Sequence, residues 1–378
     1  SAIVLTPQPR QSRRPSFSLR SILVVSLVLF ALLPAVVVTW LLARGSTQAV
    51  GELANQVMGS VALRVQTETE NHLQQAHVIM NGLFPPTLNA QQTRQARTWL
   101  EQPELFESMA FALTRQSPAV PYLYLGTARG NFFGVEQTAR GVEVSVREAR
   151  DGAANPRRFF LAAQPGDRYQ TLPGDTASYE PRTRACFFSS LRAGNRVFSP
   201  ISISAAQKQL VITLSQPIYD DFSGAAGVFA TDLHLQRLAD FLRTQRISSR
   251  GAAYLVDERG LLVATSAGDA LYKEQGGSLE RVGPDDSRNT VIRTSYSALR
   301  EGLRKKSPDA VMAEGFVDRS VSLDRLPMEG DALIAVRRPF GDELGLRWTL
   351  VVAAPEWDFT AATRRALLFS MGVIAAVL

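Results

Sequence analysis

Cysteine and histidine are scarce in this chain of 378 residues, and this scarcity limits the chemistry it can carry. A single cysteine, Cys186, cannot form an internal disulfide, so a core must hold the fold together. A lone cysteine is usually a small buried side chain rather than a nucleophile. The three histidines, His72, His77 and His234, do not fall at the i, i+4 spacing of a helical metal-binding pair. We therefore expect no metal and no cofactor.

Most of the chain carries no excess of positive charge, although the formal net charge of the whole chain is +6. Seven arginines flank two apolar segments near the ends: Arg10, Arg13, Arg14, Arg20, Arg44, Arg364 and Arg365. Once these are set aside, residues 45–363 carry a formal charge of −1. The sequence there has no basic face that would attract phosphates, so nucleic acid is not expected as a partner.

Catalytic motifs are missing as well. The acidic pairs Asp220-Asp221, Asp257-Glu258 and Asp285-Asp286 are adjacent residues in predicted turns. Adjacent side chains diverge, so such a pair cannot serve one substrate as general acid and base. The sequence shows no glycine-rich phosphate loop and no convincing Ser/His/Asp pattern. We expect no enzymatic activity within residues 1–378.

Two uncharged apolar segments are present instead, and the first is residues 21–43 (SILVVSLVLFALLPAVVVTWLLA). At about 1.5 Å per residue, a helix of this length crosses a hydrocarbon core of about 30 Å. A cleaved signal peptide is the alternative, but its apolar part would be only about 7–15 residues long. More arginines precede the run than follow it, which predicts a cytoplasmic tail over 1–20.

The second apolar segment, residues 366–378, is shorter than the roughly 20 residues that a bilayer requires. We expect a second membrane helix that begins within 361–378 and continues past Leu378, with a buried C-terminal helix as the alternative. Arg364 and Arg365 would then lie outside, against the positive-inside trend. With both crossings, residues between them form one exported segment, as in a transmembrane receptor. An adhesion or assembly module would need only one membrane anchor.

Helical periodicity follows the first apolar segment. Apolar residues at spacings near three and four over 45–83 predict one long helix, which Asn81-Gly82 and Pro85-Pro86 end. Its apolar stripe is narrow for a core helix, so we expect a second copy to cover part of it in a parallel homodimer. A second helix is predicted over 91–115. Together these helices make up a region spanning 44–119.

Two strand–turn–strand patterns come next, in which the helical period ends and short apolar runs are separated by turn residues. The first pattern comprises strands at 122–125, 132–135, 158–162, 210–214 and 226–230, followed by a helix at 233–245. The second comprises strands at 252–256, 261–264, 331–336 and 348–353. This recurrence predicts two sheet modules, over 120–250 and 251–360, rather than one large sheet.

Residues 178–190 (SYEPRTRACFFSS) place two arginines beside aromatic residues, and Glu180 is the only acid nearby. If the segment is extended, Arg182, Arg184 and Cys186 share one face. This pattern fits the lip of a pocket for an anion. It also fits a strand whose arginines are solvated.

In this order the parts resemble the double Cache family of extracytoplasmic bacterial sensor domains, over roughly residues 45–360. The landmarks are YLGTARGNFF (124–133), YEPRTR (179–184), QPIYD (216–220), GVFATDL (227–233), AYLVDERG (253–260) and WTLVVAAP (348–355). The resemblance implies an α+β fold in which a long N-terminal helix carries two PAS-like antiparallel sheets between transmembrane helices. It also implies a periplasmic sensor domain anchored in the bacterial inner membrane, with the ligand usually bound in the membrane-distal module.

Many members that bind amino acids carry a tyrosine, an arginine, a tryptophan and a tyrosine in one segment, then a further tyrosine and an aspartate. Three positions match this pattern: Tyr179, Arg184 and Asp232. Three positions depart from it: Cys186 occupies the position of the tryptophan, and Phe187 and Ile201 occupy the positions of the tyrosines. The resemblance makes these six residues, with the neighbouring Arg182, the candidate ligand site.

The matching residues retain both poles of a zwitterion site, because an arginine fork can hold a carboxylate and an aspartate can hold an ammonium group. The departures remove an indole N–H and two phenol hydroxyls and leave a more apolar wall. The ligand can therefore be an amino acid, a small carboxylate or another metabolite. Alternatively, Asp232 caps the helix predicted at 233 and Arg184 pairs with a surface acid.

These observations predict a receptor whose ligand shifts the population between two arrangements of a dimer. Its output domain would lie beyond Leu378. A histidine kinase or a nucleotide or diguanylate cyclase is expected there, with a cyclic-dinucleotide phosphodiesterase or a chemoreceptor as alternatives.

Overall fold

The computed structural model describes residues 19–149, 156–174, 178–204, 208–306, 316 and 319–361. The chain divides into two compact units, one made of Ser1–Ala54 with Phe359–Leu378 and the other of Asn55–Asp358. Among the described residues, no helix is both long enough and apolar enough for a bilayer crossing. The crossing proposed for 21–43 stays a prediction. The one expected within 361–378 lies outside the described residues from 362 onward.

The long helix predicted after residue 45 is confirmed as part of α1 (Leu19–Leu83), which ends just before the two prolines. Its buried side chains follow each other at three and four residues, at Met58, Ala62, Val65, Thr69, His72, Leu73, Ala76 and Met80. The polar stretch between 66 and 75 does not interrupt this stripe. Thr69 donates its hydroxyl to the carbonyl of Val65 at 2.7 Å, and His72 Nε2 lies 2.9 Å from the carbonyl oxygen of His234.

The helix predicted over 91–115 is two helices, α2 (Ala90–Glu101) and α3 (Pro103–Gln116). Asn89 and Gln92 form a capping box at the start of α2. Pro103 occupies the first turn of α3, where a missing N–H costs nothing, but it disfavours helix at Gln102. The proline therefore splits one amphipathic stretch into two elements.

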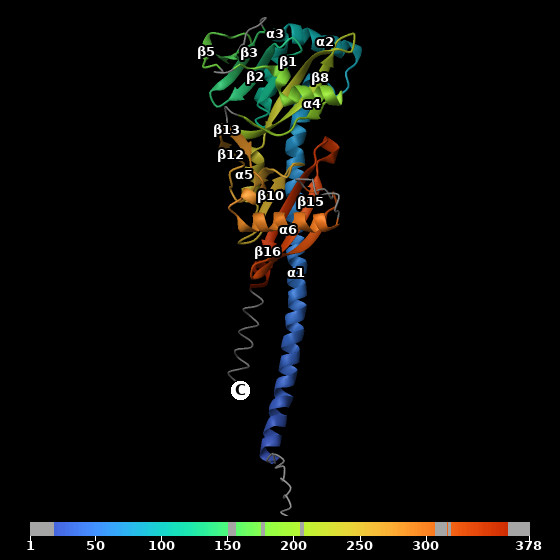
Figure 1. Ribbon diagram of the computed structural model, residues 1–378, viewed down its shortest axis with the longest axis vertical. Coiled ribbons are helices and arrows are strands. Elements are labelled where there is room, and N and C mark those ends of the chain that lie inside the picture. Colours follow the sequence, from blue (N-terminus) through green and yellow to red (C-terminus); the bar gives the residue numbers. More distant parts are fainter. Residues whose placement is uncertain are drawn as a thin grey trace, which may run out of the picture. The chain divides into compact units, whose positions relative to one another are not determined.

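The first sheet has nine strands, all antiparallel, in the order β5-β4-β3-β2-β1-β9-β8-β6, with β7 also paired to β8 (Figure 1). The strands are β1 (Tyr122–Thr127), β2 (Phe132–Thr138), β3 (Gly141–Arg147), β4 (Arg158–Ala162), β5 (Gln170–Leu172), β6 (Val197–Phe198), β7 (Ser202–Ser204), β8 (Gln209–Tyr219) and β9 (Ala225–His234). A helical turn, η1 (Pro181–Thr183), and the helix α4 (Ala185–Ala193) connect β5 to β6.

One face of this sheet packs against the helices through an aromatic core. The Phe229 ring lies 5.5 Å from both Phe84 and Phe106, and the Phe84 ring lies 5.0 Å from Trp99. Successive residues of a strand point to opposite faces. Because Phe229 faces these helices, its neighbour Ala230 faces the other side, which α4 covers in part.

A buried arginine joins this module to the end of α1. Arg196 donates to the carbonyl oxygen of Phe84 and to Asn81 Oδ1, both at 2.6 Å, and to Gln216 Oε1. Burial lowers the pKa of Arg196 to about 10, so the side chain remains protonated at neutral pH. A cation beside the last carbonyls of a helix is favourably placed with respect to the helix dipole.

The second sheet has five antiparallel strands in the order β11-β10-β16-β15-β14. They are β10 (Ala252–Val256), β11 (Leu262–Thr265), β14 (Ser322–Met328), β15 (Asp331–Phe340) and β16 (Trp348–Pro355). The helix α6 (Thr290–Lys306) packs across this sheet and buries Ile292, Tyr296 and Leu299 against Tyr254 and Leu333 (Figure 1). A separate hairpin, β12 (Tyr272–Gln275) and β13 (Ser278–Arg281), follows β11.

The predicted α+β class, a long helix followed by antiparallel sheets, is therefore confirmed. The helix predicted from residue 233 was placed too early. Strand β9 runs to His234, and the helix α5 spans Gln236–Thr244. Asp232 consequently lies inside a strand and does not cap this helix. The module boundaries at 119/120 and 250/251 stay predictions.

Candidate functional site

Four aromatic rings gather on the face of the first sheet that lies under α4. The ring centroids of Tyr122 and Tyr124 are 4.8 Å apart, those of Tyr124 and Phe132 are 5.4 Å apart, and those of Phe132 and Tyr179 are 5.1 Å apart. Cys186 and Ala230 complete this buried cluster, which we call the tyrosine cluster. The rings of the tyrosine cluster form an apolar surface, which we call the aromatic floor, and the Tyr124 hydroxyl beside it is free to bond polar neighbours such as Asp232.

Strand register explains why these residues meet. In the β1–β9 pair, Tyr122 lies opposite Asp232 and Tyr124 lies opposite Ala230, so residues two apart on each strand share one face. Gly134 of β2 leaves room for the ring of Tyr122. A Cβ at Gly134 would lie 2.8 Å from the Tyr122 hydroxyl oxygen. The glycine is thus required by close packing.

Asp232 is held at the edge of the tyrosine cluster by hydroxyl groups. Its Oδ1 accepts hydrogen bonds from the Tyr124 hydroxyl at 3.0 Å and from Thr213 Oγ1 at 2.6 Å. Among the described residues, no lysine or arginine forms an ion pair with this carboxylate. Burial raises the pKa of Asp232, and the hydroxyl bonds and the charge of Arg184 act in the opposite direction. The site therefore holds a carboxyl group that accepts hydrogen bonds from two hydroxyls and has no bonded cation among the described residues.

Two guanidinium groups lie over the same rings. Arg157 Cζ is 4.0 Å from the centroid of the Tyr179 ring and 5.5 Å from that of Phe132. Arg184 Cζ is 5.5 Å from the Tyr179 ring, and its side chain forms no ion pair with any residue that the structure describes. Cations attract the negative faces of aromatic rings, so both arginines are favourably placed over the cluster.

The segment 178–190 is not extended, contrary to the arrangement considered from the sequence. Pro181 begins the turn η1, Arg184 is the N-cap residue of α4, and Gly194 ends α4 with a φ of 68°. Proline suits the first position of a helical turn, and glycine suits the left-handed cap. Arg182, Arg184 and Cys186 therefore do not share a strand face.

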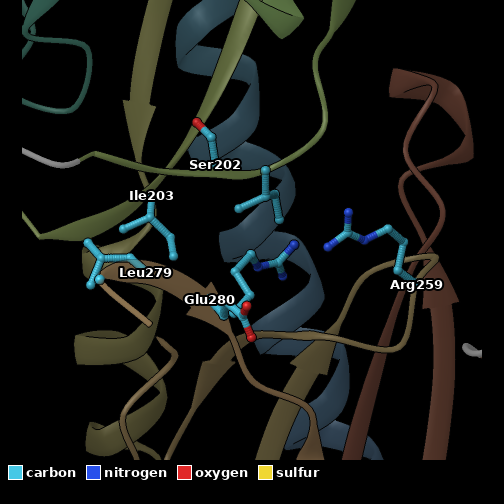
Figure 2. Close-up of a pocket in the computed structure, with 8 residues that line it drawn as sticks. Ser202, Ile203, Arg259, Leu279 and Glu280 are labelled. Carbon is cyan, nitrogen blue, oxygen red and sulfur yellow. The ribbon is translucent and has the colours of Figure 1, made fainter. Parts of the chain in front are cut away.

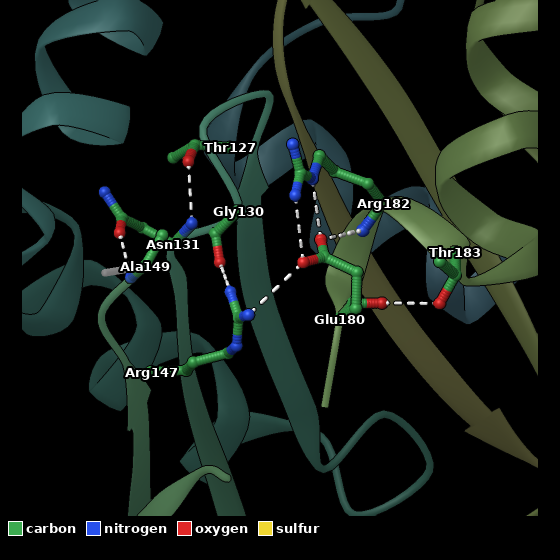
Figure 3. A network of polar contacts seen from close by, with 8 residues as sticks. All are labelled: Thr127, Gly130, Asn131, Arg147, Ala149, Glu180, Arg182 and Thr183. Atoms are coloured by element: carbon green, nitrogen blue, oxygen red, sulfur yellow. Dashed lines mark hydrogen bonds and ion pairs between the residues drawn. The ribbon is translucent and has the colours of Figure 1, made fainter. Parts of the chain in front are cut away.

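Arg182 binds its own neighbour instead of facing the tyrosine cluster (Figure 3). Its Nε lies 2.8 Å from Glu180 Oε1, and its side chain is exposed. Glu180 also pairs with the buried Arg147 at 3.2 Å, and Arg147 donates to the carbonyl oxygen of Gly130. Glu180 thereby fastens η1 to the turn between β1 and β2. Arg182 contributes to that fastening rather than to the aromatic floor.

The other predicted residues lie in different places. Cys186 is buried in the tyrosine cluster, with its Sγ 3.7 Å from the Tyr124 hydroxyl oxygen. Burial raises the pKa of its thiol to about 11, so the thiol is protonated at neutral pH. Phe187 is buried but lies outside this cluster. Ile201 follows β6 and lines a separate cavity beside β7.

Tyr122, Tyr124, Phe132, Arg157 and Thr213 join the site without having been predicted. The alternation of Tyr122 and Tyr124 within a strand was a usable signal, since both must face the same side. Arg157 and Thr213 carried no such signal because they reach the site through tertiary contacts. No group of three or more histidine, cysteine or acidic side chains suitable for a metal ion occurs in the described part of the chain.

No family model matches this chain, and no curated protein matches it. Solved structures do. The periplasmic sensory domain of the Campylobacter jejuni chemoreceptor Tlp1 matches with a TM-score of 0.50 and 11% identity, over 82% of this chain and 98% of that one. The chain has the double Cache fold.

Other structures with this fold align less closely. The ligand-binding domain of Mlp24, solved with asparagine, has a TM-score of 0.46 and 15% identity over 84% of this chain and 98% of its own. The ligand-binding domain of the Pseudomonas aeruginosa amino acid chemoreceptor PctB, solved with L-Arg, has a TM-score of 0.42 and 16% identity. It covers 83% of this chain and 91% of its own.

Proposed function

We propose that the tyrosine cluster, with Arg184 and Asp232, binds a small metabolite that carries both a carboxylate and an ammonium group. The observation that supports this most directly is the pair of opposite charges beside one aromatic floor. Among the described residues, neither charge has an ion-pair partner of its own. Burial raises the pKa of the Asp232 carboxyl, and Arg184 lies close enough for its charge to act in the opposite direction.

Each group has a clear part in such a site. The guanidinium of Arg184 is suited to a carboxylate because it can donate two parallel hydrogen bonds. The carboxylate of Asp232 is suited to an ammonium group, and the hydroxyls of Tyr124 and Thr213 fix its orientation. The rings of Tyr122 and Phe132 can pack against the carbon atoms between the two poles. A simple carboxylate without an amine would be repelled by Asp232, which favours an amino acid-like ligand.

We further propose that this region is the periplasmic sensor of a receptor in the bacterial inner membrane. The double Cache fold shared with the Tlp1 sensory domain supports a sensory role. Leu63 and Val78 of α1 are more than half exposed, and these apolar side chains support a homodimer along this helix. A histidine kinase or a nucleotide or diguanylate cyclase following Leu378 would receive the signal, and a chemoreceptor output is equally compatible with this fold.

The proposal is tested by measuring the melting temperature of the purified chain, in detergent, with each common amino acid and with small organic acids. A ligand at a hundredfold excess over its Kd should add about 2.7 kcal/mol to the free energy of unfolding. Arg184→Gln should weaken binding of an active amino acid roughly 10- to 100-fold, because a hydrogen bond to a charged group contributes about 1.5–3 kcal/mol. Binding affinity would be measured by titration calorimetry.

Arg182→Gln is the matched control two residues away. Since Arg182 is exposed and bound by Glu180, its loss should change ligand affinity by less than about twofold and leave stability close to that of the wild type. Equal losses of affinity in the two variants would show that the segment acts through its structure and not through Arg184. The absence of a melting shift with any compound would contradict the proposed site.

A further inference from the structure

A cavity of about 660 Å³ lies where β7 of the first sheet meets the hairpin β12–β13 (Figure 2). Three of its lining side chains are aliphatic and come from both elements. The lining residues are Ile201, Ser202, Ile203, Arg259, Gly277, Leu279, Glu280 and Arg281. None of them belongs to the tyrosine cluster, so this cavity is separate from the site proposed above.

A single buried carboxylate positions two arginines of this cavity. Asp257 Oδ1 accepts a hydrogen bond from the backbone N–H of Arg259 at 3.0 Å, and its Oδ2 pairs with the Arg281 guanidinium. Arg281 also donates to the carbonyl oxygen of Leu262 at 2.9 Å. The side chains of Arg281 and Asp257 are only 5% and 3% exposed, so this arrangement is built into the module.

The two arginines leave capacity for a further acceptor. The Nε of Arg281 is buried and has no hydrogen-bond partner. Arg259 projects its guanidinium into the cavity and forms no ion pair with a described residue (Figure 2). Burial lowers the pKa of Arg281; the Asp257 carboxylate acts in the opposite direction, and the positive charge of Arg259 acts in the same direction as burial. Two cations that repel each other across an open cavity would be stabilised by an anionic group bound between them.

Glu280 and the aliphatic side chains limit which kinds of anion the cavity can bind. Glu280 lines the same cavity, and its negative charge disfavours a ligand with a second anionic group. Ile203 and Leu279 extend from β7 and β13, and they offer a surface for a short hydrocarbon chain (Figure 2). We propose that this cavity is a second ligand site, which binds a small aliphatic monocarboxylate with its carboxylate at Arg259 and Arg281.

Such a ligand would fasten the hairpin to the first sheet. The Tyr272 hydroxyl already donates to the carbonyl oxygen of Lys208 at 2.8 Å, and β7 pairs with β8, which carries Thr213 of the tyrosine cluster. Occupancy of the second site would therefore add contacts between β7 and β12–β13. Binding at the two sites is expected to be coupled through β8.

The experiment uses 3-methylbutanoate as the probe and its neutral amide, 3-methylbutanamide, as the matched compound. Phenylglyoxal labels exposed arginines, and mass spectrometry of the full chain gives the labelling rate at each residue. The carboxylate should slow labelling of Arg259 several-fold, and the amide should not. The exposed Arg288, in the same module, should react at an unchanged rate.

Titration calorimetry with the same probe supplies the second measurement. Arg259→Gln should weaken 3-methylbutanoate binding roughly tenfold, since a charge-assisted hydrogen bond is lost. Arg288→Gln should leave it unchanged. Unprotected Arg259, or equal protection by the amide, would overturn the proposal. Sensitivity to Arg184→Gln without sensitivity to Arg259→Gln would also overturn it, by assigning the probe to the tyrosine cluster.

Discussion

Asp232→Asn is expected to abolish most binding of an ammonium-bearing ligand while making the ligand-free protein more stable. The amide oxygen can still accept the hydroxyls of Tyr124 and Thr213, but the negative charge is gone. Loss of a charged hydrogen-bond partner should weaken binding by roughly 10- to 100-fold, from about 1.5–3 kcal/mol. Titration calorimetry measures this affinity, and urea denaturation without ligand measures the stability.

The expected gain in stability follows from the pKa of Asp232, which burial raises above the ordinary value of 3.8. The folded state holds this proton more tightly than the unfolded chain does. The contribution of Asp232 to stability is therefore greatest at a pH below 3.8 and falls as the pH rises through its raised folded pKa. The amide in the Asp232→Asn variant does not titrate, so that protein should lack this loss and exceed the wild type in stability at neutral pH.

The exposed Asp286 provides the control. Asp286→Asn removes one negative charge, as Asp232→Asn does. It should change neither the ligand affinity nor the pH dependence of stability appreciably. Wild-type affinity in the Asp232→Asn variant would remove Asp232 from the site. A variant with lower stability than the wild type at neutral pH would show that the carboxylate stabilises the folded state.

Arg281→Met is expected to lower the free energy of unfolding by about 3–5 kcal/mol, because it leaves the buried Asp257 carboxylate without its cation. The loss would be measured from the midpoint and slope of urea denaturation. Asp257 also accepts the backbone N–H groups of Arg259 and Leu261, both at 3.0 Å, so its turn should loosen as well.

Arg325→Met is the matched substitution at an exposed pair. Arg325 contacts Glu356, and the two side chains are 70% and 22% exposed. An ion pair in water contributes about 0–1 kcal/mol, so this variant should stay close to the wild type. Similar losses in the two variants would mean that burial does not distinguish the Arg281–Asp257 pair from a surface contact.

In the proposed site, ligand binding and folding stability make opposite demands on Asp232. Burying the tyrosine rings stabilises the folded state, whereas ionising the buried Asp232 carboxyl beside them costs free energy that an apolar residue would not cost. A retained, costly charge of this kind is more easily explained by a bound cation than by the needs of folding. The same reasoning applies to Arg259, whose guanidinium faces the cavity and forms no ion pair with a described residue.

Much of the secondary structure could be predicted from the sequence, because residue spacing and prolines act on the backbone within a few residues. The spacing of apolar residues predicted α1, and the prolines after residue 84 predicted its end. Short apolar runs bounded by turn residues predicted β1, β2 and β10. The rules failed where two local signals competed. Pro103 divided one amphipathic stretch, and the strand pairing of β9 with β8 extended to His234, where the sequence alone suggested a helix.

The amino-acid sequence by itself determined the long helix, nine of the strands, the absence of an internal disulfide and the presence of Arg184 and Asp232 as candidate charges. Only the tertiary structure decided which groups these charges meet. Tyr124 and Asp232 are 108 positions apart and become partners through the register of β1 and β9. Strand register and side-chain pairing depend on contacts between distant segments, and no local pattern of residues encodes them.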